Sequence, residues 1–130
     1  MRNIGNIYEA LAQQHLINQG LAIITTNYVA HRIGEIDLIA KDKDTLVFVE
    51  VKARKRSQFG SSIESVTPSK QRKIINTASH FLQHHPQYDG MDCRFDVIGF
   101  DVEHQTSGSN QINHENYPKI HWIKNAFLVE

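Results

Sequence analysis

The stretch GEIDLIAKDKDTLVFVEVKA, residues 34 to 53, decides the fold of this chain. Two apolar runs that are rich in β-branched residues, 34 to 40 and 45 to 53, flank the polar letters KDKD. Apolar runs separated by a short polar turn are typical of a β-hairpin. The sequence therefore predicts two antiparallel strands joined by a turn at residues 41 to 44.

Charged side chains interrupt this predicted hairpin. If the turn occupies residues 41 to 44, or the central two of them, opposing residues have numbers that sum to 85. Asp37 then faces Phe48, and Glu50 is its diagonal neighbour. Because side chains alternate between the two faces of a strand, Asp37, Glu50 and Lys52 project from one face. Diagonal partners lie about 7 to 8 Å apart, which lets two carboxylates bind one cation.

Two carboxylates this close are more stable with a hard divalent cation between them than without one. Without a partner, Asp37 and Glu50 would repel each other and lose solvation on a partly apolar face, whereas Mg²⁺ takes oxygen ligands and keeps several waters. Lys52 would then stabilise charge that develops on a bound phosphate group. The alternative is a solvated outer face with a Glu–Lys surface pair, which contributes at most about 1 kcal/mol.

The remaining elements follow from hydrophobic periodicity and capping signals. The chain is expected to form one α/β domain over residues 1 to 130, a mixed sheet flanked by helices in the order α-β-β-β-α-β-β. The polar stretch 103 to 116 indicates a flexible loop. Beyond the hairpin, the predicted helices are 3 to 19 and 68 to 84, and the predicted strands are 21 to 30, 93 to 102 and, as a strand or a strand followed by a turn, 119 to 128.

Two helical side chains are candidates for the neighbourhood of the carboxylates. Glu9 lies at the edge of the apolar side expected to be buried, a position that is most often simply exposed. Gln71 lies one turn before the apolar stripe of the second helix, on the same face. The expected buried side of the first helix comprises Ile4, Ile7, Leu11 and Asn18.

Charge is distributed unevenly along the chain. The 14 basic and 14 acidic residues give a formal net charge of zero, yet residues 52 to 73 are strongly basic. A locally basic segment can bind a polyanion in a neutral protein, and a solvated loop is the alternative. The candidate residues for contact with a nucleic acid are Arg54, Lys55, Arg56, Lys70, Arg72 and Lys73.

Cysteine content and hydropathy favour a cytoplasmic protein without membrane contact. Cys93 is the single cysteine, so neither an intrachain disulfide nor a cysteine-based zinc site can form. A zinc site of histidines is not expected either, because His84 and His85 are adjacent and point in different directions. The sequence has no apolar run of the length that a signal peptide or a membrane span needs.

The spacing of Asp37 and Glu50-Val51-Lys52 resembles the PD-(D/E)xK nuclease superfamily, which includes type II restriction endonucleases and archaeal Holliday junction resolvases. A longer pattern is similar to the YraN family of small bacterial resolvase-like proteins. Ile36 stands where the superfamily motif has proline, a residue that carries no chemistry. The longer pattern comprises Gly5, Glu9, Asn27-Tyr28, GEIDLIA, VFVEVKAR, Phe59-Gly60, Lys70-Gln71, RFDV and NAF.

This resemblance implies a restriction-endonuclease-like fold and a metal site. Asp37, Glu50 and the main-chain carbonyl of Val51 would bind Mg²⁺ or Mn²⁺. Glu9 would complete metal binding through water. By the same resemblance, Lys52 would be the catalytic lysine, and Gln71 a helix residue that borders the site.

The function expected from the residues and the resemblance is metal-dependent endonuclease activity that hydrolyses DNA phosphodiester bonds, with branched DNA as a substrate by analogy. A nucleic-acid-binding or adaptor protein that keeps the nuclease fold without turnover is the competing hypothesis. A third is a structural protein whose hairpin displays a charged face. Cleavage of both DNA strands would need two sites and hence a homodimer.

Overall fold

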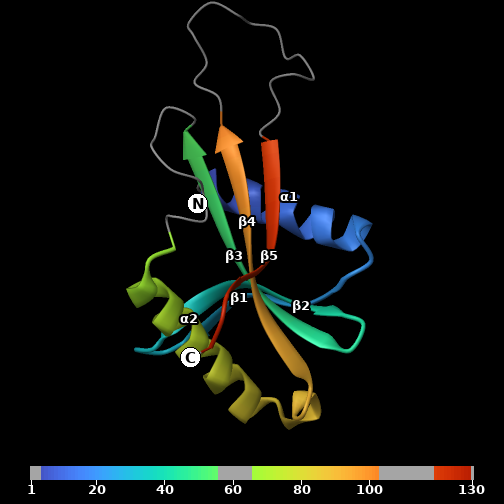
Figure 1. Ribbon diagram of the computed structural model, residues 1–130, viewed down its shortest axis with the longest axis vertical. Helices are drawn as coiled ribbons and strands as arrows, with labels where there is room; N and C mark the ends of the chain where they lie inside the picture. Colours follow the sequence, from blue (N-terminus) through green and yellow to red (C-terminus); the bar gives the residue numbers. More distant parts are fainter. Residues whose placement is uncertain (1–3, 56–65, 103–118, 130) are drawn as a thin grey trace, which may run out of the picture.

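The described parts of the computed structural model, residues 4–55, 66–102 and 119–129, contain one five-stranded sheet with the strand order β1-β2-β3-β4-β5 (Figure 1). The β3–β4 pair is parallel, and the other neighbours are antiparallel. Figure 1 shows that β3, β4 and β5 cross the direction of β1 and β2, because the sheet is strongly twisted. The strands are β1 (Ala22–Ala30), β2 (Gly34–Asp42), β3 (Thr45–Lys55), β4 (Asp92–Val102) and β5 (Lys119–Phe127).

Helices precede β1 and connect the parallel strands, since a parallel pair needs a crossover connection. Helix α1 spans Ile4–Asn18, and α2 spans Pro68–His84 between β3 and β4. Thr67 caps α2 by accepting a 3.2 Å hydrogen bond from the main-chain nitrogen of Lys70. The predicted α/β class and the order α-β-β-β-α-β-β are confirmed, with a 3-10 turn, η2 (Pro86–Tyr88), as an addition. The predicted loop at 103–116 lies outside the described residues.

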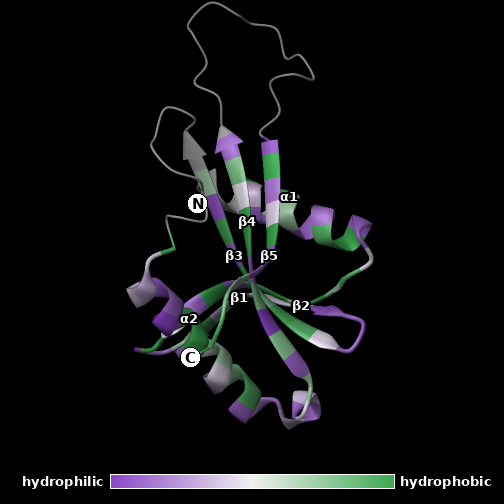
Figure 2. Cartoon of the chain, in the orientation of Figure 1, coloured by the Kyte–Doolittle hydropathy of each residue, from purple (hydrophilic) through white to green (hydrophobic). Residues whose placement is uncertain are grey.

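Both faces of the sheet are covered, one by each helix. Along β3, Val47 and Val49 belong to the buried cluster that includes Ala12 and Leu16 of α1. Phe48, between them in sequence, belongs to the cluster that includes the buried face of α2. Figure 2 shows hydrophobic residues along the central strands and a hydrophilic turn between β2 and β3. A polar group on β3 is therefore held between two apolar layers.

The register of the β2–β3 hairpin differs from the predicted one by two residues. Leu38 pairs with Val49, so opposing numbers sum to 87 rather than 85. The turn occupies residues 43 and 44, one position later than the expected central pair 42 and 43, and Lys43 in it adopts a left-handed backbone conformation, with φ of 55°. A shift of two keeps every side chain on its predicted face. Continued beyond this pair, the register sets Asp37 directly opposite Glu50 instead of diagonal to it.

The expected buried side of α1 is wrong. Ile7 is 60% exposed and Leu11 is 42% exposed, whereas Ala12 and Leu16 are fully buried. Apolar residues lie all around this helix, so their spacing does not select a face, and packing against the sheet does. Glu9 lies in the column of Ala12 and Leu16 and is half-buried.

Candidate metal and catalytic site

The candidate site forms where the hydrogen-bonded ladder between β2 and β3 ends, just beyond the Leu38–Val49 pair. Beyond this pair, a side chain is the hydrogen-bond acceptor for β3: Oδ2 of Asp37 accepts a 2.8 Å hydrogen bond from the main-chain nitrogen of Val51. The carboxyl groups of Asp37 and Glu50 also share a hydrogen bond. The prediction that the strands bring these two carboxyl groups together is confirmed.

The pair is electrostatically costly because it is shielded from water. Burial, with further repulsion from Glu50 and Glu9, raises the pKa of Asp37 to about 8, although the bond from Val51 opposes the shift. Burial also raises the pKa of Glu50, and the positive charge of Lys70 opposes that rise. The two carboxyl groups therefore hold a proton between them near neutral pH. Two acids forced to share a proton are typical of functional sites.

Two lysines converge on one oxygen of Glu50. The ammonium nitrogen of Lys52 lies 3.3 Å from Oε1, and that of Lys70 lies 3.2 Å from the same atom. Lys52 was expected here, whereas Lys70 was assigned only to a nucleic-acid contact. The sequence held a signal for Lys70: it lies four residues before the buried Ile74, on the face of α2 that packs on the sheet.

The two other helical candidates lie near this group in different ways. Glu9 contributes a negative charge that Asp37 senses. Gln71 follows Lys70 at the start of α2, and its amide nitrogen donates a 3.0 Å hydrogen bond to the main-chain oxygen of Val66. Within the described residues, no group of three or more histidine, cysteine or acidic side chains is arranged to hold a metal ion, so Asp37 and Glu50 stand as a pair.

The predicted nucleic-acid contacts are only partly described. Arg72 and Lys73 are exposed on the first turns of α2, next to Lys70. Arg54 and Lys55 are the last two residues of β3, and their side chains are not among those described; Arg56 lies outside the described residues. Where it is described, the basic segment begins beside Glu50 and continues onto the outer surface of α2.

The chemistry of the donor set fits a hard cation. Carboxylate oxygens are the protein ligands that Mg²⁺ and Mn²⁺ prefer, and Mg²⁺ is usually bound by one or two carboxylates with water filling the other positions. A divalent cation between Asp37 and Glu50 would replace their shared proton and remove their repulsion. The main-chain carbonyl of Val51 as a further ligand stays a prediction.

The chain is an α/β protein with a mixed sheet. It carries a carboxylate pair beside two lysines where the pairing of β2 with β3 ends. Residues 8–100 match the family described as "Uncharacterised protein family UPF0102", and the chain belongs to that family. UPF0102 is the YraN family, so the resemblance found in the sequence is confirmed. The matched region includes the carboxylate pair and both lysines.

The family relationship extends over nearly the whole chain. A UPF0102 protein of Francisella tularensis subsp. tularensis is 48% identical over 126 residues, covering 97% of this chain and 95% of the relative. A UPF0102 protein of Alcanivorax borkumensis is 42% identical over 129 residues, covering 99% and 94%. One of Psychrobacter sp. is 41% identical over 129 residues, covering 96% and 87%.

In the described part of this chain, no helix is long and apolar enough to cross a membrane.

Proposed function

We propose that this protein is a metal-dependent endonuclease that hydrolyses phosphodiester bonds in DNA, with branched DNA as one candidate substrate by analogy. The observation that carries the proposal is the hydrogen-bonded pair of the part-buried Asp37 and the buried Glu50, with Lys52 and Lys70 against it. A purely structural strand face gains nothing from two acids that share a proton under an apolar layer. A carboxylate pair can hold a divalent cation, which assists phosphate cleavage.

Each residue has a role in hydrolysis. Asp37 and Glu50 would hold Mg²⁺ or Mn²⁺, which supplies Lewis-acid stabilisation of the scissile phosphate when bound. Lys52 orients the attacking water and stabilises the negative charge that develops on the phosphoryl oxygens. Water adds to phosphorus, the ester P–O bond breaks, and the proton lost by water balances the one gained by the leaving oxygen. The main-chain N–H of Val51 fixes the orientation of Asp37.

The surroundings of the pair favour a polyanionic substrate. Lys70 connects the site to the exposed Arg72 and Lys73, which lie within one turn of it on α2. Contacts from basic side chains to flanking phosphates position a nucleic acid without reading its sequence. Cleavage of both strands of a branched substrate would call for two copies of this site, and hence a homodimer.

The proposal is tested by incubating the full chain with linear, flapped and four-way DNA in Mg²⁺ or Mn²⁺. Asp37→Asn and Lys52→Met are expected to lower the cleavage rate at least about 100-fold, because each removes a group aimed at the reacting phosphate. Asp101→Asn is a matched control, since it changes an acid on β4 that pairs with the exposed His121.

The outcomes separate the hypotheses. Metal-dependent cleavage that is lost in Asp37→Asn and Lys52→Met but kept in Asp101→Asn supports the endonuclease. Cleavage that survives both site substitutions rules out the proposed roles of these residues. Tight binding of all three DNA forms without cleavage, in either metal, identifies a nucleic-acid-binding protein that keeps the nuclease fold.

A further inference from the structure

Two histidines, the half-buried His80 and the exposed His84, stack near the C-terminal end of α2. His80 and His84 are one helical turn apart, their ring centroids are 4.1 Å apart, and the ring planes differ by 23°. The adjacent pair His84 and His85 points in different directions, whereas His80 and His84 lie on the same side of α2. Histidines at i and i+4 on one helix face can bind the same metal ion.

The hydrogen bond of His84 fixes which ring nitrogen is available. Its Nδ1 lies 2.8 Å from the main-chain oxygen of His80. A carbonyl oxygen can only accept, so Nδ1 carries the proton and donates it. In the neutral ring the lone pair then lies on Nε2, the atom directed away from the helix backbone. His84 is exposed, so this nitrogen can be reached from solvent.

His80 has a partner that permits the same arrangement. Its Nδ1 lies 2.6 Å from the hydroxyl oxygen of Tyr28 on β1. When Nδ1–H donates to this oxygen, the lone pair of His80 also lies on Nε2. Tyr28 is held in turn by an edge-on contact with Phe81, with ring centroids 5.1 Å apart. Histidines that bind metals commonly donate their second ring N–H to a neighbouring oxygen, which orients the ring.

We propose that His80 and His84 bind one divalent transition-metal ion, of the Cu²⁺, Ni²⁺ or Zn²⁺ class, through their Nε2 atoms. Imidazole nitrogens suit these ions and not Mg²⁺. Within the described residues no third histidine, cysteine or acid joins the pair, so the other coordination positions take water or an external ligand. Because the rings are stacked and nearly parallel, binding requires them to rotate out of the stack until both in-plane lone pairs point at one ion.

This site is distinct from the carboxylate pair and does not rest on the proposed endonuclease activity. His80 and His84 lie 10 and 14 residues after Lys70 on the same helix, which is about 15 to 21 Å at 1.5 Å per residue. The two sites also differ in donor atoms: nitrogen here, and oxygen between β2 and β3. A hard ion and a borderline ion should therefore distribute between them.

The test is titration of the full chain with Ni²⁺, monitored by isothermal calorimetry and by NMR of the histidine rings. Electron paramagnetic resonance of the Cu²⁺ complex, at less than one equivalent of Cu²⁺, counts the nitrogen ligands. The unaltered chain is expected to give one tightest site with two nitrogen ligands. His84→Ala should weaken Ni²⁺ binding at least about 10-fold, and Tyr28→Phe should weaken it by about the same factor through the lost ring orientation.

The controls separate this site from other histidines and from the carboxylates. His31→Ala, which changes an exposed histidine in the β1–β2 turn, and Asp37→Asn should leave Ni²⁺ binding unchanged. Because His84 is exposed, its substitution should not unfold the chain. Equal Ni²⁺ affinity in His84→Ala and the unaltered chain, a single nitrogen ligand on Cu²⁺, or loss of Ni²⁺ binding in Asp37→Asn would each overturn the proposal.

Discussion

At the scale of single residues, Asp37 lies in surroundings that disfavour its ionised form. Its carboxyl group accepts a hydrogen bond from Val51 and shares a second one with Glu50, and burial together with the charge of Glu50 raises its pKa to about 8 from an ordinary value of 3.8. The hydrogen bonds fix where the group points, and burial makes its ionised form unfavourable. The ionised form of Asp37 is unfavourable here without a positive partner, so a bound cation would stabilise it.

This arrangement predicts how stability depends on pH. Between pH 4 and pH 8 the folded chain keeps a proton on Asp37 that the unfolded chain releases, so stability falls as pH rises, by up to about 1.4 kcal/mol per pH unit. Asp37→Asn removes this penalty and keeps an oxygen that can accept from Val51. The variant should be more stable than the unaltered chain by at least about 2 kcal/mol at pH 8, measured by urea unfolding.

Low pH and added metal ions provide two controls for the comparison of Asp37→Asn with the unaltered chain. At about pH 3, below the ordinary value of 3.8, the group is mostly protonated in both states, so the two proteins should then differ little. Mg²⁺ or Mn²⁺ should stabilise the unaltered chain at pH 8 and not Asp37→Asn, because ions that bind only the folded state raise its stability. A variant that is less stable than the unaltered chain at pH 8 would show that Asp37 is not destabilised by burial.

Residue-level prediction succeeded where a period of two was enough. Asp37, Glu50 and Lys52 were placed on one face although the assumed register was two residues off, since an even shift does not change faces. The ion pair of Lys70 with Glu50 was not predicted, and its predicted contact with nucleic acid stays a prediction. Its position beside Glu50 depends on how α2 packs across the sheet, which the pattern of one helix does not specify.

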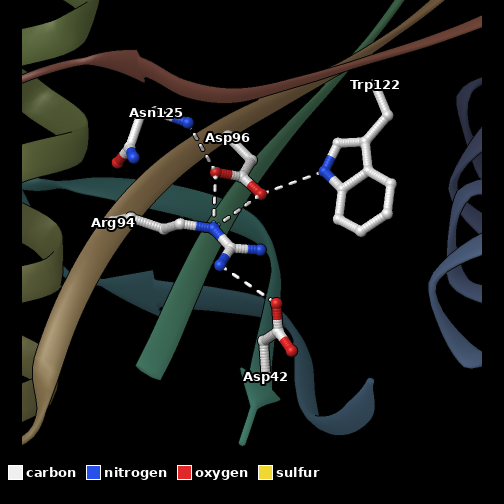
Figure 3. A network of polar contacts seen from close by, with 5 residues as sticks. All are labelled: Asp42, Arg94, Asp96, Trp122 and Asn125. Atoms are coloured by element: carbon white, nitrogen blue, oxygen red, sulfur yellow. Dashed lines mark hydrogen bonds and ion pairs between the residues drawn. The ribbon is translucent and has the colours of Figure 1, made fainter. Parts of the chain in front are cut away.

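At the scale of elements, the joint between β4 and β5 has a buried acid as its centre. Asp96 is fully buried and accepts hydrogen bonds from Arg94, the Trp122 indole and the main chain of Asn125 (Figure 3). Arg94 also pairs with Asp42 of β2 at 3.0 Å. The network lies at the irregularity in the β4–β5 register, between Phe95 and Val97. It anchors the last strand where regular pairing is interrupted.

Removal of the charge at Asp96 should therefore be costly. Asp96→Asn leaves the largely buried Arg94 with one acidic partner fewer, and breaking a buried pair on one side typically costs about 3 to 5 kcal/mol. Asp101→Asn, on the same strand, removes a partly exposed pair with His121 and should cost less than about 1 kcal/mol. Thermal or urea unfolding of both variants measures the difference; equal losses would contradict the assigned role of the network.

Sequence patterns predicted the elements themselves more reliably than the sides they bury. The bounds of α2 were readable from Thr67 and Pro68, which cap and begin the helix. The buried side of α1 was not readable, because Ile7 and Ala12 are both apolar and only the sheet determines which is covered. The role of Asp96 was hidden for a related reason: Arg94 shares its face of β4, but Trp122 and Asn125 come from β5, and no local period links that strand to Asp96.

At the scale of the whole molecule, a net charge of zero conceals a separation of charge. A protein without excess positive charge gains no general attraction to DNA, so any affinity must come from a local basic surface. Among the described residues, Arg72 and Lys73 are exposed on α2 next to the candidate site. The path of a bound strand would therefore run along the start of this helix.

Salt dependence of DNA binding tests that path. Each phosphate contact contributes a slope of about −0.9 to a plot of log affinity against log salt concentration. Arg72→Ala with Lys73→Ala should therefore reduce the magnitude of the slope by about 1.8 and weaken binding to all DNA forms alike, because phosphate contacts carry no sequence information. Lys41→Ala with Lys43→Ala removes the same charge from the exposed end of the β2–β3 hairpin and should leave the slope unchanged. The opposite assignment of the two effects would place the DNA across the hairpin end, away from Lys70 and the carboxylate pair.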